Sequence, residues 1–242
     1  MIILLFYLSI VYTNYYLFAL SILFLILILP TIYFYIDLCY FAYPYLYEYQ
    51  GKYKKIREDG CIFLDKHFEV TIHGKQIYKH PVIFCVNHPA KGSSMLSFIS
   101  LMKIKTKIKI VKFVTNDLTN KIFANLEHIF VDEKEEGQLD YLIKESQKAI
   151  NESYSILIYP EGKNSRFKKG SRLAPFKSGA FVLAKKLSIP IVPIVINEDS
   201  IHEGILANQK IDIHYLDLID PYDYDIEELK NKVFSKMKKV IR

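Results

Sequence analysis

Two short polar segments of this 242-residue chain contain the residue types needed for proton transfer and for binding a hydroxylated molecule. The first begins with Asn87-His88 and directly follows a compact apolar run. The second contains Glu161-Gly162 and follows another apolar run. In α/β folds, loops beyond the carboxyl ends of strands favour catalytic groups. The two segments therefore predict one site that is shared by two strand ends.

Each of these side chains has a chemical role open to it. An imidazole at His88 can take the proton of a hydroxyl group as that group attacks a thioester carbonyl. Glu161 can accept a hydrogen bond from a hydroxyl, and Gly162 allows a ligand to approach the backbone closely. Lys163 and Arg166 add positive charge that can meet a phosphate. The alternatives are a structural histidine, an ordinary polar turn and a solvated basic surface.

The elements that must position these segments are predicted from the apolar pattern after residue 60. Short apolar runs alternate with helical stretches, which is typical of an α/β fold with a mostly parallel sheet flanked by helices. We expect strands at residues 68–73, 81–86, 108–114, 129–131, 155–159, 190–196 and 210–216. We expect helices at residues 93–101, 117–124, 138–151, 175–187 and 226–240.

The beginning of the chain is apolar for long enough to cross a bilayer. Residues 2–29 are almost continuously apolar, and about 20 such residues span a membrane. A signal peptide is the competing interpretation, but it requires a basic leader and a small-residue cleavage site. Residues 31–49 are rich in tyrosine and phenylalanine, as expected at a membrane interface, although a tyrosine-rich helix packed on the domain is the alternative.

Charge places the remainder of the chain on the cytosolic side of that membrane. All 32 lysine and arginine residues lie at or after Lys52, and basic residues flank spans on the cytosolic side. We therefore predict three parts: a membrane-anchoring helix at residues 1–30, an interfacial segment at 31–59 and an α/β domain at 60–242. This predicts a single-pass or monotopic membrane protein with its catalytic domain in the cytosol.

Composition narrows the range of partners. The net charge of +6 suits a phospholipid surface, a phosphorylated substrate or coenzyme A, and a generic basic surface is the other interpretation. No long basic run or recognition motif indicates nucleic acid. Cys39, Cys61 and Cys85 have no metal-type spacing and, being odd in number, favour a reducing compartment. No metal site is predicted from the histidines either.

Four segments of the chain fall at expected strand or helix boundaries and contain recognisable motifs. In chain order they are Asn87-His88, Ile129-Phe130-Val131-Asp132, Tyr159-Pro160-Glu161-Gly162 with Ser165, and Pro175-Phe176-Lys177-Ser178-Gly179-Ala180 followed by Pro190-Ile191-Val192-Pro193. In order and spacing these segments resemble the motifs of the lysophosphatidic acid (glycerolipid) acyltransferase superfamily, and the resemblance covers roughly residues 65–200.

The resemblance implies an acyltransferase acting on a lysophospholipid such as lysophosphatidic acid, in phospholipid biosynthesis or remodelling. The acyl donor would be acyl-coenzyme A or an acyl carrier protein, with no metal and no other cofactor. His88 would be the general base and Ser93 its orienting partner. The acceptor would be bound by residues of the first and third motifs: Asn87, Lys91, Glu161, Gly162, Lys163 and Arg166.

Three departures from the family pattern favour an alternative function. Ser93 stands where the family has an acidic residue, and loss of an orienting carboxylate costs about 10⁴ in rate in a serine protease. Glu133 and Asn164 replace two family arginines that serve phosphate binding. The alternative is a catalytically weak or inactive relative that binds lipid or acts as a membrane scaffold. A hydrolase is disfavoured because the chain has no Gly-x-Ser-x-Gly elbow.

Overall fold

The computed structural model describes most of the α/β domain and part of the N-terminal region. The described residues are 11–20, 22–23, 26, 28–29, 32–33, 36, 53–87, 103, 107–113, 128–132, 135–162, 173–198 and 209–241. The helices expected at 93–101 and 117–124 lie outside them.

The described domain is organised around one seven-stranded sheet, in the order β1-β7-β6-β2-β5-β3-β4. The strands are β1 (Phe68–His73), β2 (Ile83–Val86), β3 (Ile108–Phe113), β4 (His128–Val131), β5 (Ser155–Ile158), β6 (Ile191–Glu198) and β7 (Gln209–Tyr215). All neighbours run parallel except β6 and β7, which are antiparallel. The mostly parallel α/β sheet predicted from the sequence is therefore confirmed, with one antiparallel pair added.

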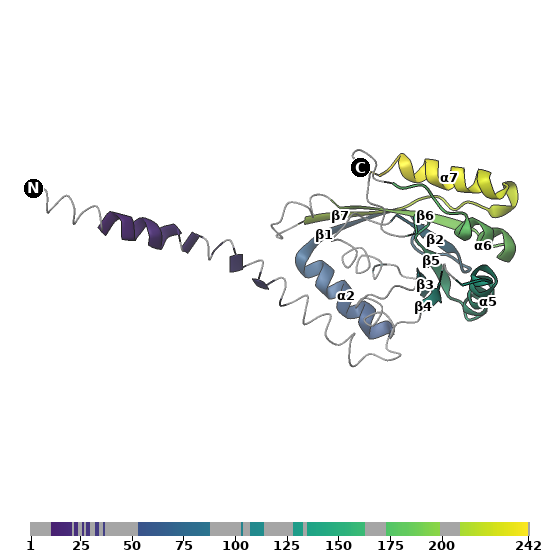
Figure 1. The fold of residues 1–242 in the computed structure, drawn as a ribbon, viewed down its shortest axis with the longest axis horizontal. Coiled ribbons are helices and arrows are strands. Elements are labelled where there is room, and N and C mark those ends of the chain that lie inside the picture. Colours follow the sequence, from purple (N-terminus) through teal and green to yellow (C-terminus); the bar gives the residue numbers. More distant parts are fainter. Residues whose placement is uncertain are drawn as a thin grey trace, which may run out of the picture.

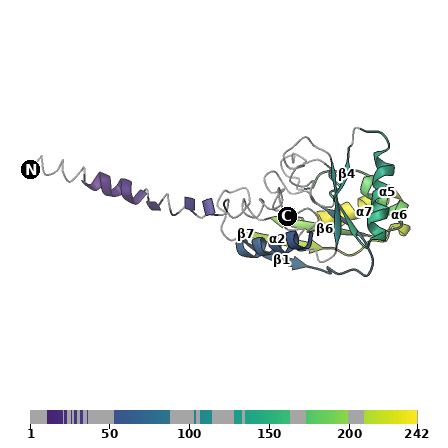
Figure 2. The ribbon, with the colours of Figure 1, turned by 90° about the horizontal axis from the view of Figure 1, so that it is seen from below.

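Helices cover both sides of this sheet (Figures 1 and 2). The helices are α2 (Tyr53–His67), α5 (Gln138–Asn151), α6 (Gly179–Leu187) and α7 (Ile226–Lys238), with a short 3₁₀ helix, η2 (Pro221–Asp223). Side chains of α5, α6 and α7 share one apolar core with the sheet. Figure 1 shows α2 beside β1 on the side opposite α7.

The centre of the sheet is its most apolar part. Every residue of β2 and β5 is buried, as expected for parallel strands covered on both faces. Phe84, Phe181 and Leu183 are among the largest fully buried side chains. Burying such a side chain stabilises a fold by about 1.5–3 kcal/mol. The loops that follow β2 and β5 therefore start from tightly packed strands.

Local sequence signals fix the ends of two helices. α5 has the bounds predicted from its apolar spacing, and Gly137 with φ +74° precedes it. α7 begins with a capping box, in which the Asp225 carboxylate accepts from the Glu228 N–H and the Glu228 carboxylate accepts from the Asp225 N–H. These bonds satisfy backbone donors that a helix start otherwise leaves without partners.

The prediction for α6 was wrong at its beginning, because the helix starts at Gly179 and not at Pro175. The preceding segment has no regular secondary structure and is hydrogen-bonded to the loop after β5. The Lys177 N–H donates to the Pro160 carbonyl at 2.8 Å, and the Ala174 N–H donates to the Glu161 carboxylate at 2.8 Å. These contacts with a distant loop override the local helical preference.

α2 was not predicted, and it crosses the expected domain boundary between residues 59 and 60. Its apolar spacing is interrupted by Gly60, and a glycine inside a helix costs about 1 kcal/mol relative to alanine. Phe63 is buried and packs against Phe68 at a ring distance of 6.4 Å. Packing on β1 therefore stabilises a helix that its sequence favours only weakly.

The N-terminal apolar segment is described in part. Residues 11–20 are helical and lie away from the sheet, with Leu17, Phe18 and Leu20 more than half exposed (Figure 1). Among the described residues, no helix combines the length and apolar character needed to cross a membrane. Much of the expected span at 2–29 lies outside those residues.

Candidate active site

The end of β2 is locked to β6 by the side chain of Asn87. Its Nδ2 donates to the Ile196 carbonyl at 3.0 Å, and its Oδ1 accepts from the Ile196 N–H at 2.7 Å. The Asn87 N–H also donates to the Ile194 carbonyl at 3.4 Å. The carboxamide thus extends the strand pairing by one residue and fixes the backbone from which the first motif continues. Substrate binding by Asn87 stays a prediction.

The end of β5 turns sharply at Gly162. This residue has φ +79°, a conformation that favours glycine, and its N–H donates to the Tyr159 carbonyl at 3.0 Å. Glu161 is only 5% exposed, and its Oε2 accepts from the Ala174 N–H at 2.8 Å. The turn therefore places a buried carboxylate and a glycine backbone directly beyond a central strand.

Lys177 belongs to the same corner of the molecule, although it was not among the predicted site residues. A Cβ atom added to Gly162 would lie 2.7 Å from Lys177 Cε and 3.0 Å from Lys177 Nζ. The ammonium group therefore lies against the Gly162 backbone, where only a glycine leaves it room. Lys177 was already part of the motif matched at Pro175–Ala180, but only the fold brings its side chain to Gly162.

The second motif contributes a polar turn between β4 and α5. The Asp132 N–H donates to the Gln138 carboxamide oxygen at 3.0 Å, and Gln138 Nε2 donates to Glu135 at 2.9 Å. The Glu135 N–H in turn donates to the Asp132 carbonyl at 3.2 Å. This network holds the start of α5 against the end of β4. The adjoining Glu133 lies outside the described residues.

A cavity of about 260 Å³ lies between this corner and α5. Tyr159 and Pro160 from the loop after β5 contribute to its wall, as do Lys177 and Gly179 at the start of α6. Val131, the last residue of β4, closes another side. The wall of the cavity therefore includes Pro160, the residue directly before Glu161.

Cys85 lies two residues before Asn87 but is not an available nucleophile. It is fully buried in β2, and this burial raises the pKa of its thiol from 9.0 to about 12. A thiolate is the reactive form of cysteine, so a thiol with this pKa is inert near neutral pH. Chemistry at this strand end therefore does not use the cysteine.

The predicted site residues fall into two groups. Asn87, Glu161 and Gly162 are described, and they lie at the carboxyl ends of the neighbouring strands β2 and β5. The others lie outside the described residues: His88, Lys91, Ser93, Lys163 and Arg166. Within the described ranges, no three His, Cys, Asp or Glu side chains gather in a way that could hold a metal ion.

Comparison with protein-family models gives a match to the Acyltransferase family over residues 69–197, which is more than half of the chain. The chain belongs to the Acyltransferase family. The matched range begins in β1 and ends in β6, so it includes both strand ends that form the candidate site.

Several acyltransferases are similar in sequence over parts of their length. The chain is 27% identical to the 1-acyl-sn-glycerol-3-phosphate acyltransferase of Cocos nucifera over 128 residues, covering 52% of this chain and 41% of that protein. It is 31% identical to the enzyme of the same name from Haemophilus influenzae over 109 residues, covering 43% of each. The chain therefore spans less than half the length of these relatives.

A solved structure resembles the fold of this chain over most of its length. The crystal structure of the 1-acyl-sn-glycerophosphate acyltransferase PlsC from Thermotoga maritima superposes with a TM-score of 0.62 at 18% identity. The superposition covers 88% of this chain and 93% of that chain. At this level of identity the likeness concerns the fold.

Proposed function

We propose that this protein is a membrane-anchored acyltransferase that moves a fatty acyl group from a thioester donor to a lysophospholipid hydroxyl. The donor is acyl-coenzyme A or an acyl carrier protein, and lysophosphatidic acid is the proposed acceptor. The observation that carries the proposal is that the first and third family motifs continue from adjacent central strands, β2 and β5. The similar 1-acyl-sn-glycerol-3-phosphate acyltransferases support the same acceptor class.

The pairing of β2 with β5 supports cooperation between His88 and Glu161. Ile83, Phe84 and Cys85 pair with Ile156, Leu157 and Ile158 at one constant sequence offset. His88 and Glu161 are separated in the sequence by that same offset. A continuation of the parallel pairing would bring the two positions level with each other, at the edge where α/β folds bind ligands.

The proposed reaction is a direct transfer. His88 takes the proton of the acceptor hydroxyl while its oxygen attacks the thioester carbonyl carbon. The tetrahedral intermediate collapses as the carbon–sulfur bond breaks, and the leaving thiolate takes the proton from the imidazolium. An ester and a thiol are formed from an alcohol and a thioester. Ser93 orients the imidazole, and Glu161 with the Gly162 backbone holds the acceptor beside it.

The phosphate of the acceptor requires positive charge near this site. Lys91, Lys163 and Arg166 are our candidates from the sequence, because lysine and arginine bind phosphate as point charge and as bidentate donor respectively. They would take the place of the family arginines that are Glu133 and Asn164 here.

A decisive experiment measures transfer from labelled acyl-coenzyme A to lysophosphatidic acid by the purified full chain in detergent. We expect labelled phosphatidic acid from the unaltered protein and none above background from His88→Ala. His80→Ala is the matched control, because His80 is exposed and outside the matched motifs. Equal product from the unaltered protein and His88→Ala would exclude the proposed base. No product with any lysolipid, but retained lipid binding, would support the inactive scaffold suggested by Ser93.

The orienting role of Ser93 has its own test. We expect Ser93→Asp to raise the rate by about an order of magnitude or more, since a carboxylate both orients an imidazole and stabilises its protonated form. The measurement is the initial rate of acyl transfer with saturating donor. An unchanged rate would show that another carboxylate already serves His88.

Membrane anchoring is proposed from the apolar N-terminal segment and its exposed side chains. We expect the full chain to float with phosphatidylglycerol-containing vesicles, and Phe18→Lys with Leu20→Lys to weaken that flotation because charge opposes insertion. Ile77→Lys is the matched control, since Ile77 is as exposed as Phe18 but lies on the α/β domain. Equal flotation of all three proteins would rule out an anchor at these positions.

A further inference from the structure

We propose that the cavity beside Pro160 takes the acyl chain already carried by the lysophospholipid acceptor, while Lys177 pairs with the acceptor's phosphate. The proposal rests on the function proposed above and assigns a place to each end of the acceptor. It also adds Lys177 to the candidate cations, none of which was taken from the start of α6.

The wall of the cavity suits a hydrocarbon chain. It is formed mainly by the apolar side chains of Val111, Val131, Leu142, Ile158 and Ala180, which come from β3, β4, α5, β5 and α6. Its volume of about 260 Å³ is slightly below the 300–1,000 Å³ of sites that enclose whole drug-sized ligands. A cavity of this size fits part of one chain better than a whole lipid.

The position of Lys177 gives the cavity a charged entrance. Lys177 is exposed, and its side chain both lines the cavity and lies against Gly162. Among the described residues of the wall, it is the one with a formal charge. A ligand that enters an apolar cavity past an ammonium group is expected to have a hydrocarbon end and an anionic end.

The cavity lies close to Glu161 in the sequence, and the three groups of a lysophospholipid lie close together on one glycerol unit. Pro160 lines the cavity and Glu161 follows it directly. In lysophosphatidic acid the chain and the phosphate occupy two positions of one glycerol unit, and the reactive hydroxyl occupies the third. A glycerol unit at Glu161-Gly162 would therefore have its chain beside Pro160 and its phosphate within reach of Lys177.

Charge favours the acceptor's chain over the donor's chain as the occupant. The donor chain ends in an uncharged thioester, and the phosphates of coenzyme A or an acyl carrier protein lie a long pantetheine arm away. The donor's phosphates therefore lie far from Lys177 when the donor chain occupies the cavity. With lysophosphatidic acid, the phosphate is within a few bonds of the chain.

Gly179 provides a way to fill the cavity without disturbing the fold. It lines the cavity, and a Cβ atom added there meets no heavy atom within 4 Å. We expect Gly179→Leu to raise KM for palmitoyl lysophosphatidic acid about tenfold, with much less change for the hexanoyl form. Lys186→Leu adds the same side chain on the exposed side of the same helix and should leave both KM values unchanged.

Lys177 is tested by changing the headgroup of the acceptor. We expect Lys177→Met to weaken the binding of lysophosphatidic acid about tenfold, since one charged hydrogen bond to phosphate is lost. Binding of the neutral monoacylglycerol should stay unchanged. Lys177→Arg should restore most of the preference because it keeps the charge. Equal weakening of the charged and neutral acceptors would overturn the role given to Lys177.

The two chain sources are separated by repeating the Gly179→Leu measurement with donors of different length. A changed donor preference with an unchanged acceptor preference would overturn the proposal and assign the cavity to the donor. Direct titration of the full chain with lysophosphatidic acid, without donor, tests the cavity independently of turnover. Chain-length-dependent binding that Gly179→Leu weakens would support the cavity even if His88 proved catalytically inactive; length-independent binding would contradict it.

Discussion

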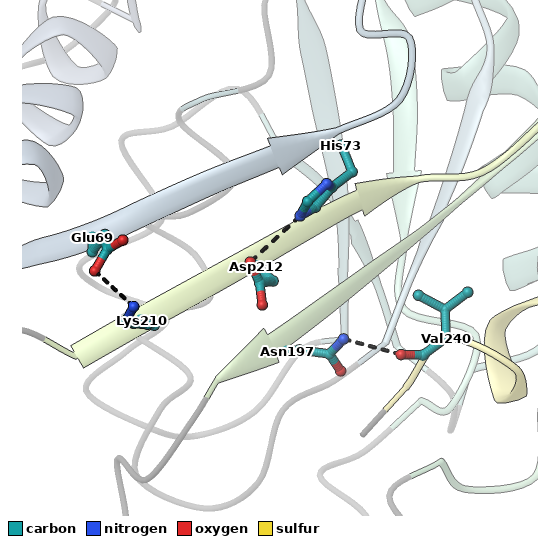
Figure 3. Close-up of polar contacts among 6 residues, drawn as sticks. All are labelled: Glu69, His73, Asn197, Lys210, Asp212 and Val240. Carbon is teal, nitrogen blue, oxygen red and sulfur yellow. Dashed lines mark hydrogen bonds and ion pairs between the residues drawn. The ribbon is translucent and has the colours of Figure 1, made fainter.

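The centre of the sheet and its outer edge are stabilised in different ways. β2 and β5 are buried along their whole length, and both candidate motifs begin at their ends. At the edge, residues of β1 alternate between less and more exposed, and polar side-chain pairs link β1 to β7 (Figure 3). Glu69 pairs with Lys210 at 3.2 Å, and His73 Nε2 lies 3.5 Å from the Asp212 carboxylate.

This difference shows where precision is needed in the molecule. Two strands packed on both faces can hold two loops in a fixed relation, because their pairing register cannot slip without exposing apolar side chains. Exposed ion pairs on an edge strand contribute little stability, although charges there discourage pairing with another chain. Substitutions at the two places should therefore differ in size by several fold.

The largest effect is expected at Asn87. Asn87→Ala removes both bonds to the Ile196 backbone and leaves a buried N–H and a buried carbonyl without that partner, which should cost about 3 kcal/mol of unfolding free energy. Denaturant unfolding of the full chain measures this. Asn197→Ala is the matched control, because it removes the bond from Nδ2 to the Val240 carbonyl seen in Figure 3, and loss of that bond should cost about 1 kcal/mol. Equal costs would contradict a special role for Asn87.

A smaller loss is expected at Gly162. Gly162→Ala places a side chain at φ +79° and pushes Lys177 aside, so we expect about 2 kcal/mol of destabilisation and reduced acyl transfer. Gly179→Ala is the control, because its Cβ has open space and alanine favours a helix. It should leave stability unchanged or raise it slightly. A thermal unfolding series with both variants makes the comparison.

The pH dependence of unfolding also reports on burial at the centre of the sheet. Because the pKa of Cys85 is raised from 9.0 to about 12, the unfolded chain releases this proton at lower pH than the folded chain does. The contribution of the thiol to the free energy of unfolding is fully present below pH 9. It should fall by about 1.4 kcal/mol per pH unit up to pH 12. Cys85→Ala should unfold with a correspondingly flatter dependence on pH. Identical pH profiles would mean that Cys85 is not shielded from solvent.

The smallest effect is expected at the edge of the sheet. Glu69 and Lys210 are 61% and 64% exposed, so a double-mutant cycle with alanine should give a coupling energy of about 0.5 kcal/mol or less. Salt should weaken even that value. A coupling above 2 kcal/mol would remove the distinction drawn between edge and centre.

The sequence predicted the parts of the fold whose signals are local. The apolar spacing of α5 and the compact apolar runs of β2 and β5 gave elements close to those observed. Two features depended on packing or hydrogen bonds between different elements and were missed. α2 is stabilised by packing on β1 despite Gly60, and the start of α6 is displaced because Lys177 bonds to Pro160 instead of beginning a helix.

The same distinction applies to the candidate site. Asn87, Glu161 and Gly162 could be found because their motifs follow apolar runs, and the order of the sheet then makes those runs neighbours. Lys177 could not be assigned to the site from spacing alone, since fifteen positions of chain separate it from Gly162 and no periodicity joins the two. Its contact with Gly162 arises only when the segment before α6 folds back onto the end of β5.

The constant offset between β2 and β5 limits how this protein can diverge. A one-residue insertion within either strand would move one motif about 3.3 Å along the sheet and turn its side chains to the opposite face. Insertions and deletions should therefore be tolerated in the connections between strands and eliminated within these two. Laboratory libraries of insertions and deletions should likewise leave β2 and β5 unchanged.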